Sequence, residues 1–172
     1  MDFEDLKRIC DKFCNVIMYK DIENLDDILG GSSNGCIVLV LWTANQGHYI
    51  TFWKDEYNNK IIHFFDPFGR KEYFGNQKIG FSNKVRTISQ INKEEEQYDN
   101  IIFNAFLRSS FDEIQFNDYK IQKDSSNLCS IWCILRLLYR KMNDKEFKDF
   151  FKGNDDEVIK FGNYLVKSKI FK

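Results

Sequence analysis

A cysteine, a histidine and an aspartate stand where they could together perform nucleophilic catalysis. Cys129 follows the capping-rich segment Asp124–Leu128 (DSSNL) and precedes the apolar stretch IWCILRLLY. Its sulfur would therefore lie in the first turn of a buried helix, where unpaired N–H groups and the helix dipole favour a thiolate. A thiolate is the attacking species in acyl transfer. The alternative is a small buried core residue, the commoner fate of a cysteine.

His48 is the candidate base, because a β-hairpin would bring an aspartate opposite it. Tyr49–Lys54 (YITFWK) and Lys60–Asp66 (KIIHFFD) have the character of strands and flank the polar turn DEYNN. A hairpin folded symmetrically about Tyr57 places His48 opposite Asp66, with Cβ atoms about 4.5–5.5 Å apart. The carboxylate could then accept the imidazole N–H and fix the tautomer. A one-residue slip of the turn would remove the match.

The other histidine, His63, is excluded from this pair by strand geometry. It lies three residues before Asp66, so its side chain points to the opposite face of the strand. This parity selects His48. Each partner has a structural alternative: His48 as a satisfied histidine at a strand start, and Asp66 as a residue that only begins a turn before Pro67.

Four cysteines offer a different use, as metal ligands. Cys10 and Cys14, like Cys129 and Cys133, are spaced by four, so on helices each pair would share one face. Together they could bind zinc. Zinc knuckles more often use C-x-x-C, and two helices lack the usual turn geometry. Cys133 is more simply a core residue one turn below Cys129.

The helices and strands expected from the sequence form one α+β domain over residues 1–172, with a central antiparallel sheet flanked by helices. The continuous apolar run Cys36–Trp42 predicts a strand buried on both faces, and the hairpin strands are also apolar on both faces. Residues 30–35 (GGSSNG) are expected to form a loop, and residues 70–100 are polar and remain unassigned. The other expected elements are a helix over Asp2–Ile17 capped by Asp2, a helix over Asn100–Ser109, a strand over Phe111–Gln122, and helices over Cys129–Met142, Glu146–Phe151 and Glu157–Val166.

Charge and composition limit the expected binding partners and the expected cellular compartment. The chain has 25 basic and 26 acidic residues, so it carries no global electrostatic footprint for nucleic acid or an anionic membrane. No apolar run approaches the roughly 18 residues that span a bilayer. The N-terminus, MDFEDLKRIC, is unlike a secretory signal, and the five cysteines are an odd number. We therefore expect a reducing compartment, without secretion.

Several of these motifs, in this order, resemble the adenain family, the maturation proteases of adenoviruses, and the related SUMO-specific proteases. The similarity lies in Gly47-His48, then Phe65–Gly69 (FDPFG), and then Gln122 seven residues before Cys129. Adenain-like enzymes have a histidine followed by an aromatic residue, a closely similar F-[E/D]-P-F-G segment, the same glutamine-to-cysteine spacing, and a second cysteine four residues after the nucleophile. These motifs span residues 47–133. The resemblance implies the papain-type cysteine protease fold of these enzymes.

The resemblance also implies roles. Cys129 would be the nucleophile, and His48 the general base and then the acid for the leaving amine. Asp66 would orient and charge-stabilise His48. Gln122, by pattern alone an exposed strand residue, would donate its side-chain amide to the oxyanion together with the Cys129 N–H.

Two residues depart from the family pattern. Ser130 follows the nucleophile where glycine is usual, and Tyr49 follows the histidine where tryptophan is usual. Adenain is markedly basic and is stimulated by DNA and by a viral peptide. The near-neutral charge of this chain argues against a DNA cofactor, while a peptide activator stays open.

By this resemblance the chain would be a viral cysteine endopeptidase that cleaves capsid or core precursors during virion maturation. Adenain-like genes also occur in virophages and virus-like transposons. We expect a monomer that needs no metal or other cofactor, located in the virion and in the host cytoplasm or virus factory. The alternatives are an isopeptidase that removes SUMO-like or ubiquitin-like modifiers, and a non-enzymatic capsid-associated or zinc-binding interaction protein.

Overall fold

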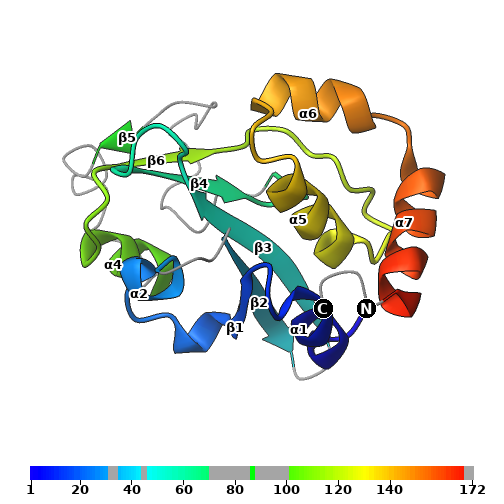
Figure 1. The fold of residues 1–172 in the computed structure, drawn as a ribbon, viewed down its shortest axis with the longest axis horizontal. Helices are drawn as coiled ribbons and strands as arrows, with labels where there is room; N and C mark the ends of the chain where they lie inside the picture. Colours follow the sequence, from blue (N-terminus) through cyan, green and yellow to red (C-terminus); the bar gives the residue numbers. More distant parts are fainter. Residues whose placement is uncertain (31–34, 44–45, 70–85, 88–100, 169–172) are drawn as a thin grey trace.

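A computed structural model describes the chain except for residues 31–34, 44–45, 70–85, 88–100 and 169–172 (Figure 1). The described residues have an α+β fold built on a six-stranded sheet in the order β1-β2-β3-β4-β6-β5. The strands are β1 (Asn15–Met18), β2 (Cys36–Thr43), β3 (Gln46–Lys54), β4 (Ile61–Phe65), β5 (Arg86–Thr87) and β6 (Glu113–Phe116). The helices are α1 (Phe3–Cys10), the 3-10 turn η1 (Tyr19–Asp21), α2 (Leu25–Ile28), α4 (Ile101–Leu107), α5 (Cys129–Leu138), α6 (Asp144–Phe151) and α7 (Asp155–Lys167).

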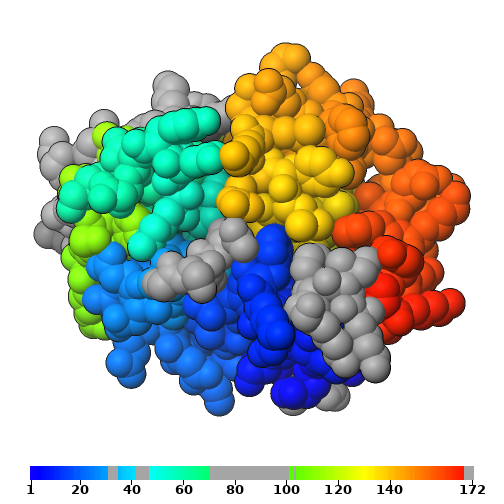
Figure 2. All heavy atoms as spheres, in the orientation of Figure 1, coloured from blue at the N-terminus to red at the C-terminus, as the bar shows by residue number. Residues whose placement is uncertain are grey.

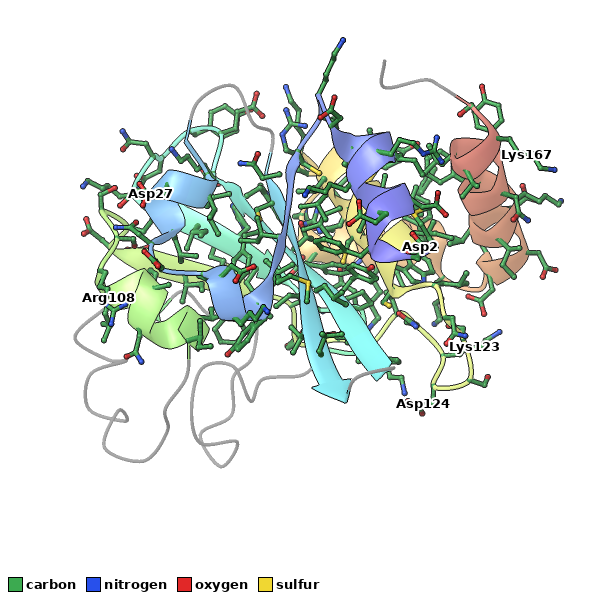
Figure 3. The ribbon with its side chains drawn as sticks, turned by 90° about the horizontal axis from the view of Figure 1, so that it is seen from below. Asp2, Asp27, Arg108, Lys123, Asp124 and Lys167 are labelled. Atoms are coloured by element: carbon green, nitrogen blue, oxygen red, sulfur yellow. The ribbon has the colours of Figure 1, made fainter. Side chains whose placement is uncertain are left out.

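The central strands bury side chains on both faces of the sheet, as their continuous apolar sequences predict. Alternate residues of a strand point to opposite faces. Ile50 of β3 belongs to one apolar cluster with Phe106 of α4, whereas Tyr49 belongs to the other with Trp132 of α5. The sheet thus lies between two cores, one beneath α2 and α4 and one beneath α1, α5, α6 and α7 (Figures 1 and 3).

The sheet is mixed, so the prediction of an antiparallel sheet is wrong for two of its strands. β2, β3 and β4 are antiparallel in sequence order, but β1 runs parallel to β2 and β6 runs parallel to β4. Parallel neighbours need a crossover, which often contains a helix. Here α2 lies between β1 and β2, and α4 lies between β4 and β6. Periodicity within a segment reports burial and does not report the direction of a neighbouring strand.

The N-terminal helix is shorter than its spacing predicts. Asp2 caps it as expected, because its Oδ1 accepts the Asp5 N–H at 2.7 Å. The helix ends at Cys10, and Asn15–Met18 form β1, where Val16 pairs with Ile37. The β-branched pair Val16-Ile17 favours a strand, and pairing with the buried β2 decides the outcome.

Several further boundaries differ or lie outside the described residues. The helix expected to end at Ser109 ends at Leu107. The expected strand over Phe111–Gln122 is limited to Glu113–Phe116, because the next residue, Asn117, binds the backbone of Asp66. Helix α5 ends at Leu138 rather than Met142. The two C-terminal helices are confirmed, although each begins two residues earlier than expected, at Asp144 and Asp155. Asn100 and most of the segment left unassigned lie outside the described residues, as do positions 31–34 of the expected loop.

Candidate active site

His48 and Asp66 meet in the hairpin through a pairing that differs from the expected one. The observed register pairs Lys54 with Ile62, which centres the hairpin on Asn58 instead of Tyr57. Direct opposition of His48 and Asp66 is therefore wrong. The partner shift is two residues, so the period-two alternation keeps both side chains on the same face. They become diagonal neighbours across the two strands, a distance that long side chains can span.

The turn residue Asp55 explains this register. Its Oδ1 accepts the N–H groups of Tyr57 at 2.9 Å and Asn58 at 2.8 Å, and its own N–H donates to Ile61 O at 3.0 Å. An aspartate that binds the backbone two and three residues on is a common turn initiator. Asp55 therefore ends β3 and sets the loop length that a symmetric count about Tyr57 misses.

The contact between His48 and Asp66 is short and buried. His48 Nε2 donates to Asp66 Oδ1 at 2.6 Å, and both residues have 0% relative exposure. The same Oδ1 accepts the Phe68 N–H at 2.8 Å. The Phe68 ring stacks on the imidazole with a centroid separation of 4.7 Å and an interplanar angle of 28°. Because Nε2 is used by Asp66, Nδ1 is the ring nitrogen left to serve the sulfur of Cys129.

Cys129 is the first residue of α5 and keeps partial exposure. Burial acts to raise the pKa of its thiol. Hydrogen bonds with His48, with the Tyr49 N–H and with the Ser130 N–H, together with the charge of His48, outweigh burial and lower that pKa. Conversely, burial would lower the pKa of His48, but hydrogen bonds with Asp66 and Cys129 and their charges raise it to about 9. The pair is therefore biased toward thiolate and imidazolium.

The start of α5 favours a thiolate at Cys129 because no side chain caps this end of the helix, although the preceding sequence is rich in capping residues. The N-cap is Leu128, which makes no side-chain capping bond. The polar residues before it do not cap the helix, so no capping side chain competes with the sulfur for the first-turn N–H groups. Lys123 and Asp124 in this loop are exposed and point outward (Figure 3).

Gln122 is buried at 2% exposure, which rules out the alternative of an exposed strand residue. Its backbone N–H donates to Pro67 O at 3.0 Å, so it is tied to the residue that follows Asp66. Its side-chain Nε2 donates to Ser126 O at 2.6 Å. This bond sets the orientation of the amide and uses one of the two hydrogens on Nε2.

Asn117 is a buried polar residue of the site that the sequence analysis missed. It is 2% exposed and makes hydrogen bonds with both backbone groups of Asp66. In the sequence it is one polar residue in a loosely alternating segment, FDEIQFNDYKIQ. Nothing in that pattern separates it from its neighbours, since its importance depends on a partner 51 residues away.

The other histidine belongs to a separate polar cluster at the tip of the hairpin. His63 Nε2 lies 2.8 Å from Asp55 Oδ2, and its ring stacks on Trp53 at 5.0 Å, in agreement with the parity that excludes it from Asp66. Burial lowers the pKa of His63. The cluster borders a cavity of about 640 Å³ between the hairpin tip and the end of α5, where Arg136 lies over Trp53. In Figure 2 the hairpin atoms (teal) meet those of the α5 end and the loop after it (yellow to orange).

The metal-binding alternative gains no geometric support. Within the described part of the chain, no group of three or more histidine, cysteine or acidic side chains is arranged to hold a metal ion. Cys10, Cys14 and Cys133 are buried in the core cluster beneath α5, while Cys129 contacts His48. Cys133 therefore has the core position expected of it.

Among the described residues, no helix has the length and hydropathy needed to cross a membrane. No protein-family model matches the chain. Over 167 residues the chain is 27% identical to uncharacterized protein V9 of the Sputnik virophage, in an alignment that covers 90% of this chain and 89% of V9. This relative is a viral protein whose name gives no activity.

Proposed function

We propose that the chain is a cysteine endopeptidase in which Cys129, His48 and Asp66 act as nucleophile, base and orienting carboxylate. The observation that carries this proposal is the single imidazole that contacts both partners. His48 donates to Asp66 at 2.6 Å through Nε2 and lies close enough to Cys129, at the start of α5, for each group to shift the pKa of the other. A nucleophile, a base and a third group that orients the base are the signature of an activated nucleophile.

In the proposed reaction, the Cys129 thiolate attacks the carbonyl carbon of a peptide bond. The protonated Nδ1 of His48 then gives its proton to the departing amine, and a thioester remains on Cys129. Water attacks the thioester while His48 takes one of its protons. The acid product leaves, and the thiolate and imidazolium are restored. Asp66 keeps Nε2 protonated and the ring in place throughout.

Gln122 supplies a donor for the negative oxygen of the tetrahedral intermediate. One hydrogen of its Nε2 binds Ser126 O, and the second is assigned to the oxyanion. The backbone N–H of Cys129 is the second donor. Loss of one such donor typically costs about 3 kcal/mol of barrier.

The substrates we propose are viral capsid or core precursors, cleaved during virion maturation by a single papain-type domain over residues 1–172. Two observations support this. The residues that make the site, His48, the FDPFG segment and the Gln122–Cys129 spacing, are those that resemble adenain. The chain is also similar to a virophage protein over nearly its whole length. We further propose that it acts as a monomer without a metal, in the virion and the infected cell.

The test is co-expression of the chain with the capsid and core precursors encoded by the same genome, with cleavage sites mapped by mass spectrometry. The wild type should process a precursor, whereas Cys129→Ala and His48→Ala should not, and circular dichroism should show that both variants are folded. Processing at the wild-type rate by either variant would refute the proposal.

Two other outcomes would favour the alternatives. Rapid turnover of a fluorogenic SUMO-like or ubiquitin-like substrate ending in Gly-Gly, with no cleavage of precursors, would indicate an isopeptidase that uses the same residues. Stoichiometric zinc in the purified protein, with no alkylation of Cys129, would indicate a non-enzymatic module.

A further inference from the structure

We propose that Asn117 is a positioning residue. It holds Asp66, which orients His48, in a fixed place relative to residues 117–122, which carry the oxyanion donor Gln122. This inference rests on the proposed function, since it concerns the same site. Asn117 is 2% exposed and lies directly after β6, at the point where the ladder between β4 and β6 stops. Because its amide binds the protein backbone, its role is to place other groups.

The amide of Asn117 binds the backbone of Asp66 at two points. The Asp66 N–H donates to Asn117 Oδ1 at 2.9 Å, and Asn117 Nδ2 donates to Asp66 O at 2.7 Å. One side-chain amide therefore binds both backbone groups of the residue that orients His48. A continued strand would have bound them with its own backbone, but strand pairing ends at Phe64 and Phe116.

Asn117 also connects Asp66 to the segment that leads to Gln122. Asn117 Nδ2 also donates to Tyr119 O at 2.8 Å, which fixes the chain as it turns toward residue 122. Pro67 O accepts the N–H groups of Ile121 and Gln122, each at 3.0 Å. Residues 66–67 and 117–122 are thus bonded to each other at several points, with Asn117 at their centre. A displacement of Asp66 would then also displace Gln122.

The residue type matters because Asn117 is both an acceptor and a twofold donor. An apolar side chain of similar size would leave the Asp66 N–H, the Asp66 carbonyl and the Tyr119 carbonyl without this partner in a buried place, which is costly. An aspartate would keep the acceptor and lose both N–H donors. Only an amide of this length satisfies the three groups together.

The experiment measures chemistry in Asn117→Ala against a matched control. Thr51→Val removes another buried polar contact of the same sheet, the bond from Thr51 Oγ1 to Cys36 O at 2.8 Å, without touching the site. For Asn117→Ala we expect kcat on the mapped precursor peptide to fall by about tenfold to a hundredfold, the scale of loss caused by a displacement of roughly 1 Å, with KM nearly unchanged. Thr51→Val should keep kcat within about twofold at a comparable loss of melting temperature.

Two further readouts report the site without a substrate. In Asn117→Ala the midpoint of the pH dependence of Cys129 alkylation by iodoacetamide should move to higher pH, because a displaced Asp66 no longer supports the imidazolium. The downfield proton resonance of the short His48–Asp66 hydrogen bond should weaken or shift. Thr51→Val should change neither readout.

Unchanged kcat, alkylation midpoint and resonance in folded Asn117→Ala would overturn the inference. If that variant fails to fold, Asn117→Asp keeps the volume and the acceptor for the Asp66 N–H, and its kcat should still fall at least tenfold. If the wild type cleaves no precursor but its Cys129 is alkylated with a midpoint at low pH, the endopeptidase proposal is refuted. The two substrate-free readouts would still decide the role of Asn117.

Discussion

Phe68 contacts His48 and Asp66 at the same time, with its ring stacked on the imidazole and its N–H bonded to the carboxylate. The ring centroids lie 4.7 Å apart, and the Phe68 N–H is 2.8 Å from the same Oδ1 that accepts from His48. The turn after β4 therefore sets the orientation of the imidazole from two sides. The neighbours of Asp66 in the FDPFG segment also have specific contacts: Phe68 stacks on His48, Pro67 O binds residues 121 and 122, and Gly69 turns the chain beside Tyr119.

The first prediction concerns this stacking contact. Phe68→Leu should keep the backbone bond to Asp66 but lose the ring contact, which for aromatic pairs contributes about 0.5–1.5 kcal/mol. We expect kcat/KM to fall by roughly threefold to tenfold, measured on the precursor peptide. Phe64→Leu is the control, because Phe64 packs against Phe52 in the core beneath α2 and α4. Equal losses in both variants at equal stability would contradict the orienting role of Phe68.

The second prediction concerns selective alkylation. At pH 7 iodoacetamide should modify Cys129 first, because contacts with His48 lower its pKa against the effect of burial. Burial raises the pKa of Cys36 and Cys133, so both should react only after unfolding. Mass mapping of the modified peptide is the measurement. His48→Ala should slow the reaction of Cys129 at pH 7 by about tenfold or more, since the thiolate loses its counter-charge.

The third prediction concerns stability against pH. Despite burial, hydrogen bonds and charges raise the pKa of His48 from 6.5 to about 9 in the folded state. A group whose pKa is raised by folding stabilises the fold fully below its unfolded pKa and loses that effect as the pH passes its folded value. Its contribution should therefore be present below about pH 6.5 and disappear as the pH rises through about 9.

Urea unfolding at intervals from pH 6 to pH 9.5 measures this contribution. The difference in unfolding free energy between Cys129→Ala and the double variant Cys129→Ala/His48→Gln should shrink with rising pH. The cysteine is removed in both proteins because its lowered pKa contributes with the opposite sign. Cys129 also helps to raise the pKa of His48, so what remains in this background is the effect of Asp66 against burial, and the contribution should be lost below about pH 9. A difference that grows with pH would contradict a His48 pKa raised by Asp66.

The fourth prediction concerns Gly69. This residue has a φ of +64°, and an added Cβ would lie 2.6 Å from Tyr119 O. Gly69→Ala should therefore cost the left-handed backbone penalty of about 1–2 kcal/mol and, in addition, push residues 117–122 away from the Asp66 turn. We expect lower unfolding free energy together with at least a tenfold loss of kcat.

Gly153 provides the matched control for this substitution. It has a φ of +79°, and an added Cβ would meet nothing within 4 Å. Gly153→Ala should show the backbone cost alone in thermal unfolding and leave kcat unchanged. Loss of activity in both variants would mean that stability, and not the contact with Tyr119, accounts for the effect of Gly69→Ala.

Local sequence patterns are enough to predict which residues could do chemistry and on which faces of their strands and helices they lie. Alternation in the hairpin separates His48 and Asp66 from His63, and this parity survives a register that shifts by two residues. The apolar stretch after Cys129 puts that residue at the start of a buried helix. These properties depend on local periodicity, which neighbouring residues carry.

The partners of these residues and the directions of the strands follow only from long-range packing. The diagonal contact of His48 with Asp66 depends on how Asp55 ends β3. The parallel pairing of β1 with β2 and of β6 with β4 depends on crossover connections. Asn117 shows most clearly what a local pattern cannot predict, because its hydrogen bonds join it to Asp66, 51 residues earlier in the chain. A pattern read along one segment carries no information about a group that another segment brings to it, and at this site the geometry consists of such long-range contacts.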